Sequence, residues 1–588
     1  MLSQVRQKAL QTAQDYFRAA NQHQSSIEFR SKCINDYGFY DGTGQWEDSD
    51  LRTLKARNQF PITVNICKGF IDNLSGVEIQ SRYRTACRSD SHNPEDDKLA
   101  EALTHLLFYI QENQELPYKG SLKFRDSLIC GIGWSHLYRE DGKIFYDYVH
   151  PFNVIPDPDD LTPQYNAMKY VCRKRWMRPD MVKARWPKVV IDDGDHFEES
   201  PELMDRGSSY TDSDTQTNQS RVLVVEVQYK VPQKVYRGMD TNGRSFETFD
   251  LDTAEELAGK NSIETDTKGE RIMRTLFWGN TLLEHAPLEA TFPDQADFSY
   301  IPIVFQRRFR TGVPYGLLES MKDIQKDCNV RLTKSIYAIN SSRVVFEGNP
   351  MPGKELESIR DELRTADSVI CLPKDSKFQI SNNAQMGEEQ LKIIELYLKL
   401  IQRVTGIFDE MLGIQTNATS GVAQNMRQVN SVRNNVFAFD NFSQMKKRES
   451  RFLLNAIQSS NVMNASVEIL TPNERELIIL NLKTKNGIFN DIRTLPLSLY
   501  IEEVPDYQSS FAEQKATFES LLSNAHAQWL MLSPELLRRM GVRNPEQISQ
   551  EMQQAMQQKT TMEQGVAGRG EPVQFPQSGN PAGAGATQ

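Results

Sequence analysis

A long, uninterrupted helical pattern lies between Gly316 and Asn340. Apolar residues recur there every three or four positions with no intervening proline, at Leu317, Met321, Ile324, Cys328, Leu332, Ile336 and Ile339. This spacing predicts one amphipathic helix. At ~1.5 Å per residue, about 24 residues give a rod about 36 Å long.

A second rod of matching length is predicted from Glu388 to Leu412. One apolar stripe follows Leu391, Ile394, Leu398, Ile401, Thr405, Phe408 and Met411, and another follows Ile393, Leu396 and Leu400. A helix that is apolar on two faces must be covered on two faces. The rods therefore predict a helical hairpin whose outer faces pack on neighbouring subunits. The insert at 341–385 is predicted to contain a strand, a Pro/Gly turn, a short helix (354–366) and a strand (368–372).

Polar residues dominate the chain after the second rod. Gly413–Ser420 has the small and polar residues typical of a loop, and Ser420 is a suitable N-cap for a very long third helix that reaches Ile457. Asn, Gln, Ser and Arg prevail in this helix. Two interpretations fit them equally: a solvent-exposed bridging helix, or the inner wall of a channel, because neutral amides neither trap nor strongly repel phosphates.

Alternating and mixed patterns on either side of these helices predict an α+β fold. Helices are predicted at 1–20 and 97–114, and strands at 61–65, 144–149, 222–231, 301–305, 477–482 and 497–502. A polar, acidic stretch at 192–220 predicts a long loop or a disordered insertion. A helical segment is predicted at 510–558, and the Gly, Pro, Ala and Gln of 565–588 predict a disordered tail.

Composition and charge narrow the class of protein. The 588 residues are 39% hydrophobic and 25% charged, as in an ordinary folded protein, and no run approaches the ~18 apolar residues of a membrane span. Residues 1–20 suit an amphipathic helix and not a signal peptide, so the protein is expected to stay where it is made. The net charge of −10 disfavours a protein that wraps DNA, because such affinity comes from Lys and Arg. The chain could still enclose DNA without gripping it.

A Gly-x-x-x-x-Gly-Lys sequence within Gly348–Glu355 suggests an enzyme. It lies between a predicted strand and a predicted helix, the setting of a nucleotide-binding phosphate loop. Glu355 replaces the hydroxyl residue that holds magnesium, and Pro350 and Pro352 each remove an N–H from the phosphate cradle. A Pro/Gly turn is therefore the favoured interpretation, with a nucleotide-driven DNA-translocating ATPase kept as the alternative.

The sequence carries no other catalytic or metal signature. It has no GxSxG and no HExxH, and its eight histidines do not pair at ligand spacing. His136 and His150 are expected to be core histidines, Cys130–Gly133 a tight turn, and Asp157–Asp160 and Asp192–Asp195 solvated acidic turns. Seven scattered cysteines predict reduced core thiols. No catalytic residue, cofactor or metal site is predicted.

Several short motifs, taken in order, resemble the portal proteins of tailed bacteriophages, especially the short-tailed (podovirus) branch. The main one is Tyr315-Gly316 followed by Asp323-x-Gln325-x-x-x-Asn329 and Ser335. The others are Phe39–Gly42 with Gln45-Trp46, Arg57–Asn65, Asp72–Gly76, Gly131-x-Gly133, Pro151–Asp157, Glu226 and Ile501–Pro505. Together they cover most of residues 35–510, and their order and spacing carry the resemblance.

The resemblance implies a ring, expected to be a dodecamer, around a DNA channel. The chain would comprise an N-terminal helical arm (1–30), a mixed α/β wing (31–310 and 421–509), a two-helix stem (311–346 and 386–412), a small α/β clip (347–385), a tunnel loop (413–420), a short helical crown (510–558) and a disordered tail (559–588). The ring would assemble in the host cytoplasm and sit at one vertex of the virion, beside the major capsid protein. It would bind the terminase large subunit during packaging and tail or adaptor proteins later.

Two sets of residues follow from this assignment. The DNA channel is expected to involve the tunnel loop and third helix at Gln415, Thr416, Asn417, Thr419, Arg427 and Arg433. Terminase or adaptor docking is expected in the clip at Lys354, Glu357, Arg360 and Arg364. A ring of acidic subunits would repel the phosphates and so let DNA slide. A virion structural adaptor that does not enclose DNA is the remaining alternative.

Overall fold

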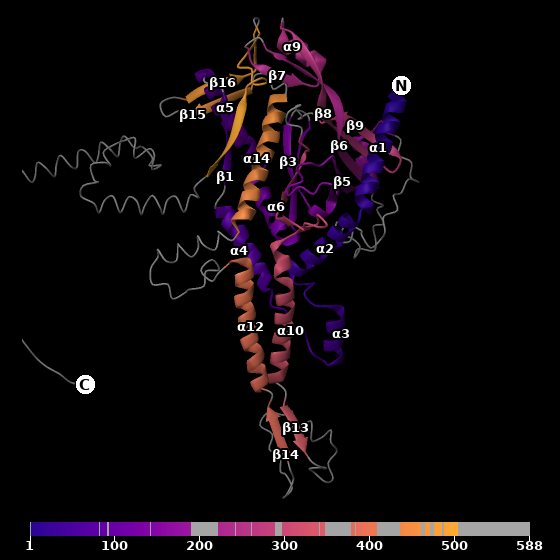
Figure 1. The fold of residues 1–588 in the computed structure, drawn as a ribbon, viewed down its shortest axis with the longest axis vertical. Coiled ribbons are helices and arrows are strands. Elements are labelled where there is room, and N and C mark those ends of the chain that lie inside the picture. Colours follow the sequence, from indigo (N-terminus) through magenta and orange to yellow (C-terminus); the bar gives the residue numbers. More distant parts are fainter. Residues whose placement is uncertain are drawn as a thin grey trace, which may run out of the picture. The chain divides into compact units, whose positions relative to one another are not determined.

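The computed structural model describes residues 2–80, 83–90, 93–140, 143–189, 222–240, 243–259, 261–288, 297–339, 342–346, 378–382, 384–407, 435–459, 465–470, 475–484 and 487–503 (Figure 1). These residues belong to one compact unit, Met1–Val504. Helices and antiparallel strand pairs make up this unit, and this mixture confirms the predicted α+β class.

The largest sheet has six strands in the order β4-β5-β6-β8-β9, with β7 paired to β6. The strands are β4 (Val154–Pro156), β5 (Tyr170–Met177), β6 (Val222–Met239), β7 (Ser245–Thr248), β8 (Ile263–Trp278) and β9 (Thr281–Pro287). Side chains along a strand alternate between the two faces of the sheet. Val225 of β6 therefore shares a core with Phe17 of helix α1 (Leu2–Gln22), whereas Val224 shares one with Val182 of α7 (Pro179–Arg185). The predicted N-terminal helix thus covers one face of this sheet.

A second sheet, in the order β10-β2-β3, lies in the main hydrophobic core. It consists of β10 (Tyr300–Val304), β2 (Ile132–Glu140) and β3 (Lys143–Val149), and it contacts helices α6 (Leu116–Cys130) and α14 (Val436–Ser459). The rings of Phe124 in α6 and Phe442 in α14 lie 5.1 Å apart and are fully buried. Segments far apart in the sequence are held together by this packing.

The last strand of the described chain lies beside this core. β1 (Tyr83–Ser89) pairs with β19 (Leu497–Glu503), and α5 (Pro94–Asn113) contacts β1 and β15 (Ala465–Leu470). Two further strand pairs are short hairpins, β15 with β16 (Arg475–Leu480) and β17 (Leu482–Thr484) with β18 (Gly487–Phe489). Helix α9 (Leu251–Ala258) packs on β6. Residues 477–482, predicted as one strand, are divided between β16 and β17, because Asn481 adopts a left-handed turn conformation (φ 50°).

The predicted helical hairpin is present (Figure 1). A single 3₁₀ turn, η4 (Leu317–Ser320), leads into α10 (Lys322–Ile339), which lies side by side with α12 (Ala384–Thr405). Between the helices, β13 (Ser342–Phe346) pairs with β14 (Phe378–Asn382), from Ser342 opposite Asn382 to Phe346 opposite Phe378. The first strand of the insert was predicted, whereas β14 was not.

Helix α12 ends at Thr405 and not at Leu412, so the predicted extent of the second rod was wrong. The reason lies in the local backbone. Gly406 takes a left-handed conformation (φ 69°), and its N–H bonds to the carbonyl of Gln402. The Thr405 hydroxyl donates to the carbonyl of Ile401 (2.8 Å) and accepts from the N–H of Ile407 (3.3 Å). A left-handed glycine ends a helix at little cost because it has no side chain to clash.

Several predicted features lie outside the described residues. They are the acidic stretch at 192–220, the loop at 348–355, the helix and second strand of the insert at 354–366 and 368–372, the tunnel loop at 413–420, the third helix up to residue 434, and the segments at 510–558 and 565–588. The proposed boundaries of arm, wing, stem, clip, crown and tail remain predictions.

Candidate functional site: the root of the two-helix hairpin

An extended segment runs along α10 between helices α3 (Asp48–Ala56) and α4 (Ile66–Gln80). We call residues 59–65 the strap. Alternate backbone N–H groups donate to successive α10 side chains: Phe60 to Tyr337 (2.7 Å), Ile62 to Thr333 (3.1 Å), Val64 to Asn329 (3.1 Å) and Ile66, at the start of α4, to Gln325 (3.1 Å). The side-chain amide of Gln325 also donates to the Val64 carbonyl (2.6 Å). The strap is thus hydrogen-bonded to one face of the helix.

We call these hydrogen bonds between the strap and α10 the ladder. It forms because the residue spacing of an extended chain matches that of an α-helix. Two residues of extended chain span about 6.6 Å, and four residues of α-helix rise about 6.0 Å. Side chains at every fourth helix position can therefore meet every second residue of an antiparallel extended segment. The prediction of a strand at 61–65 was wrong for this reason: the backbone is extended, but its partners are helix side chains and not a neighbouring strand.

Buried amides connect the ladder to the turn after α2 (Gln24–Asp41). Asn329 donates to the side-chain oxygen of Gln45 (2.7 Å), and Gln45 donates to the carbonyl of Phe39 (3.0 Å). Tyr40 donates its hydroxyl hydrogen to Asp72 in α4, and its carbonyl accepts from the Asn65 side chain (2.7 Å). Four of the motifs that carry the resemblance therefore meet in one hydrogen-bonded network around the beginning of α10.

The motif Gly131-x-Gly133 and the Tyr315-Gly316 pair meet where the chain crosses α6. A Cβ atom on Gly133 would lie less than 3.0 Å from the carbonyl oxygen of Lys123, and one on Gly316 would lie equally close to the carbonyl oxygens of Leu128 and Ile129. Gly131, which caps α6 with φ 99°, lies against the backbone of Tyr315. Glycine is needed at this crossing because the backbones themselves are in contact.

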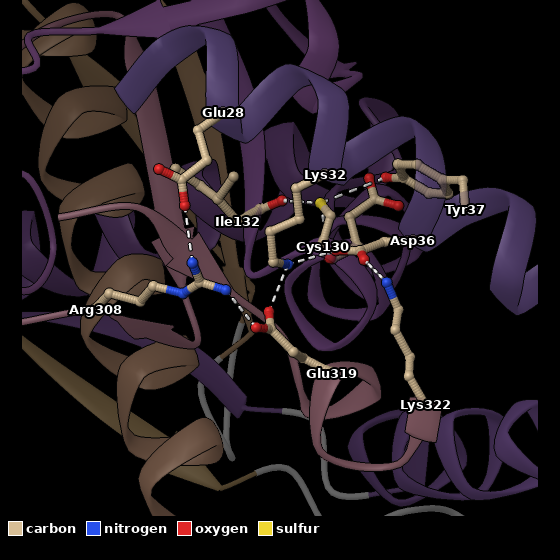
Figure 2. A network of polar contacts seen from close by, with 10 residues as sticks. Glu28, Lys32, Asp36, Tyr37, Cys130, Ile132, Arg308, Glu319 and Lys322 are labelled. Atoms are coloured by element: carbon tan, nitrogen blue, oxygen red, sulfur yellow. Dashed lines mark hydrogen bonds and ion pairs between the residues drawn. The ribbon is translucent and has the colours of Figure 1, made fainter. Parts of the chain in front are cut away.

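Charged residues of α2 bind the root of the hairpin, as Figure 2 shows. The Lys32 ammonium lies 2.5 Å from Asp36 and 3.0 Å from Glu319 of η4, and Asp36 also pairs with Lys322 of α10. The Asp36 side chain is fully buried. Burial by itself would lower the pKa of Lys32, but the two nearby carboxylates outweigh it and raise that pKa. Lys32 therefore stays charged and holds α2 to η4.

A second group of contacts joins α2 to Arg308, the residue after β11 (Gln306–Arg307), and to the end of α6. The guanidinium of Arg308 bridges Glu28 (2.8 Å) and Glu319 (2.5 Å). Behind it, the thiol of Cys130 lies 3.9 Å from the hydroxyl of Tyr37 (Figure 2). Elements from three separate stretches of sequence thereby fix the direction in which η4 and α10 leave the core.

The strap and α12 lie on opposite faces of α10. Tyr397 of α12 donates to Asp327 (2.6 Å), and Arg331 donates to Gln390 of α12 (2.8 Å). Asp327 follows the strap-binding Gln325 by two positions, which places it about 200° around the helix. Figure 1 agrees, with α3 on one side of α10 and α12 on the other. Within one chain α10 is therefore covered on both sides.

Among the described residues, neighbours cover helix α12 on one side only. Ile401 is buried, but four other apolar residues are exposed: Leu391 (41%), Leu396 (52%), Leu398 (36%) and Val404 (52%). Leu391 and Leu398 are seven positions apart and so share one side of the helix. Exposed apolar residues that gather on one side are typical of a surface that binds another protein. The prediction that this helix is apolar on more than one face is confirmed.

The chemistry-bearing residues singled out in the sequence have structural roles. His136 is buried and its pKa is lowered by burial and by Arg173, so it is neutral, and burial lowers the pKa of His150 to about 4. Asp157 accepts the backbone N–H groups of Asp159 (3.1 Å) and Lys169 (3.0 Å) in a turn. Six of the seven cysteines lie in the described ranges, and all six are buried and unbridged. Cys371 lies outside those ranges.

Two negative findings apply to the described part of the chain alone. There, no group of three or more His, Cys, Asp or Glu is placed to hold a metal ion. No helix in the same ranges is apolar over a length sufficient to cross a lipid bilayer.

The residues predicted for the channel and for docking cannot be compared with this geometry. Every one of them lies outside the described residues: Gln415, Thr416, Asn417, Thr419, Arg427, Arg433, Lys354, Glu357, Arg360 and Arg364. In contrast, the binding of the strap backbone by side chains of α10 was not predicted from the sequence. A signal existed, because Gln325, Asn329, Thr333 and Tyr337 form a polar stripe at every fourth position beside the apolar stripe of α10.

Replacing Asn329 with alanine is expected to loosen the strap by about 1–2 kcal/mol, because the N–H of Val64 and the amide of Gln45 each lose a partner. Hydrogen–deuterium exchange should then be about tenfold faster at residues 60–66, since 1.4 kcal/mol corresponds to a factor of ten. Lys334→Ala, at an exposed position of the same helix, is the matched control. Unchanged exchange in the Asn329 variant would contradict the ladder.

These features define a class of protein: a structural subunit whose mixed α/β body holds a two-helix hairpin in a fixed direction. The particular family is shown by comparison with known proteins. Residues 14–582 match the family described as Phage P22-like portal protein, and the chain belongs to that family. It is thus a structural protein of the phage virion that serves DNA packaging. A comparison with curated protein sequences found no match.

Proposed function

We propose that copies of this chain close into a ring at one vertex of the capsid, and that double-stranded DNA enters and leaves the virion through its centre. The observation that carries the proposal is the exposed apolar surface of α12, a helix that the described part of one chain covers on a single side. Membership of the portal family supports it. In this proposal α10 and α12 are the stem, the segment around β13 and β14 is the clip, and the ring is a dodecamer.

The ring acts as a passive or valve-like conduit and performs no catalysis of its own. A net charge of −10 per subunit supports this, because acidic walls repel phosphates and give DNA no strong binding site. The motor that consumes nucleotide is a separate protein, the terminase, which docks on the ring during packaging. Tail or adaptor proteins bind the clip afterwards, and assembly takes place in the host cytoplasm.

Electron-microscope class averages of the purified protein test the proposal. We expect closed rings with a central hole. A chain that stays monomeric at every concentration would overturn it, and compact oligomers without a hole would favour a virion adaptor that does not enclose DNA. Nucleotide binding that is lost on Lys354→Ala would favour the ATPase alternative.

Alanine substitutions in the tunnel loop at 413–420 are expected to change the length or retention of packaged DNA while rings still form. The reason is that this small, polar segment is proposed to be the narrowest part of the channel. Packaged DNA length can be measured on purified virions by gel electrophoresis. Loss of ring assembly in these variants would contradict the placement of the loop.

A further inference from the structure

Helix α3 and the strap together lie along α10 and bury little of their own surface. We call residues 47–65 the arm from here on, as distinct from the N-terminal arm predicted at 1–30. None of the nine residues of α3, all of which are described, is buried, and in the strap Phe60 is 79% and Val64 46% exposed. A helix of nine residues is marginal in water unless it packs against something, because so few hydrogen bonds do not offset the cost of its first turn. The arm therefore needs a partner beyond the contacts it makes in one chain.

The direction of the arm is set by its contacts with α10. Glu47 pairs with Lys326 near the beginning of α10 (3.2 Å), and the N–H of Phe60 bonds to Tyr337 near its end (2.7 Å). Helix α3 therefore runs in the same direction as α10. Helix α12 runs the opposite way, because the hairpin reverses the chain. Because both contact α10, each residue of the arm and of α12 can be assigned to a level, that is, to the position along the α10 axis that it lies beside.

Exposed charges on the arm and on α12 are complementary at the two ends of α10. Near the beginning of α10 the arm is acidic, with Glu47 and Asp48, and α12 is basic, with Lys399 and Arg403. This follows from the pairing of Tyr397 with Asp327, which places Lys399 close to the level of Lys326.

Near the end of α10 both signs are reversed. There the arm is basic, with Lys55 and Arg57, and α12 is acidic, with Glu388 and Glu389. The contact of Gln390 with Arg331 sets this level on α12. Between the two ends the exposed charges are mixed, with Asp50 and Arg52 on the arm and Lys392 and Glu395 on α12. An arm and an α12 helix placed face to face at equal height would thus attract at both ends.

The two surfaces cannot meet within one chain, since they lie on opposite sides of α10 (Figure 1). Copies related by rotation about a common axis stand at equal height, and each presents one side to the next copy and the other side to the previous one. We propose that the arm of each subunit packs on α12 of its neighbour, with Leu51, Phe60 and Val64 covering the exposed leucines of α12. This inference rests on the proposed ring and names the surfaces that close it.

Charge reversal in the full-length chain tests the contact. We expect Lys55→Glu with Arg57→Glu to reduce ring formation about tenfold, and Glu388→Lys with Glu389→Lys to do the same, because each change places like charges opposite one another. The four substitutions combined should restore rings to within about twofold of the unchanged chain. The matched control is Lys183→Glu with Lys188→Glu. Lys183 lies in α7 and Lys188 follows that helix, and both are exposed. Ring formation is scored by electron microscopy, and thermal melts report whether each variant is folded.

A second measurement needs no substitution. A zero-length carboxyl–amine cross-linker applied to wild-type rings should join Lys55 of one subunit to Glu388 or Glu389 of another. The Glu47–Lys326 pair, 3.2 Å apart within one chain, is the internal control. Absence of the first link while the second forms would overturn the inference, and so would a combined variant that assembles no better than either pair alone. If the unchanged chain makes no rings, the proposed function fails first and this inference falls with it.

Discussion

Replacing Gly133 with alanine is expected to prevent the protein from folding, or to destabilise it by about 3 kcal/mol or more. A Cβ atom there would lie less than 3.0 Å from the carbonyl oxygen, the carbonyl carbon and the Cβ of Lys123. None of these atoms is the end of a flexible side chain, so relief requires α6 and β2 to move apart. Overpacking of this kind in a rigid core costs about 1–3 kcal/mol and sometimes more. Gly316→Ala should behave alike, since its Cβ would meet the carbonyl oxygens of Leu128 and Ile129.

Gly69→Ala is the control for the Gly133 and Gly316 variants, because it adds the same methyl group at a position without close neighbours. Gly69 lies in α4, and a Cβ there meets no heavy atom within 4 Å. Alanine favours a helix over glycine by about 1 kcal/mol, so this variant should be as stable as the unchanged protein or slightly more stable. Soluble yield and urea unfolding midpoints measure both effects. A well-folded Gly133→Ala protein would show that α6 and β2 do not touch as described.

Replacing Glu449 with glutamine is expected to cost about 3–5 kcal/mol of unfolding free energy. Glu449 of α14 pairs with Lys123 of α6 inside the core, and its carboxylate also accepts hydrogen bonds from Ser135 (2.5 Å) and Tyr146 (3.0 Å). The Lys123 side chain is fully buried, and this burial lowers its pKa while the carboxylate acts in the opposite direction. Removing one partner of a buried pair leaves an uncompensated charge, which accounts for the size of the effect.

Adding Lys123→Met to Glu449→Gln should recover at least about 2 kcal/mol, because the stranded charge is gone and the glutamine oxygen can still accept from Ser135 and Tyr146. A double-mutant cycle of urea unfolding at fixed protein concentration measures this coupling. The exposed Arg185–Glu140 pair is the control, and Glu140→Gln should cost no more than about 0.5 kcal/mol. Additive single effects in the cycle would contradict the pairing of Lys123 with Glu449.

Local patterns predicted the helices well. The three-to-four spacing of apolar residues located α10, α12 and α1 because side chains on one face of a helix recur with the helix's own period. The end of α12 was misplaced, since apolar spacing continues through Phe408 and Met411 although Gly406 turns the backbone. Periodicity records which face is apolar, and it does not record where a backbone leaves the helix.

Pairing between distant segments was beyond the reach of these patterns. The strap has the composition of a strand, and only the folded chain shows that α10 supplies its hydrogen-bond partners. Lys123 and Glu449 are single charges on two helices that meet across the core, and the local sequence of neither helix predicts that they pair. The glycines at 131, 133 and 316 were recognised as motifs, but the reason for them is a contact between backbones far apart in sequence.

From its sequence alone this protein could be assigned to the portal family, to a mixed α/β fold and to a hairpin of two long helices with apolar surface left over. Those properties depend on residue order, on short motifs and on a period of 3.6, all of which are written locally. Which residues anchor the hairpin, on which side of α10 the strap lies and which charges stand at equal height were decided by tertiary structure. They depend on contacts between segments whose separation in the sequence gives no measure of their distance in space.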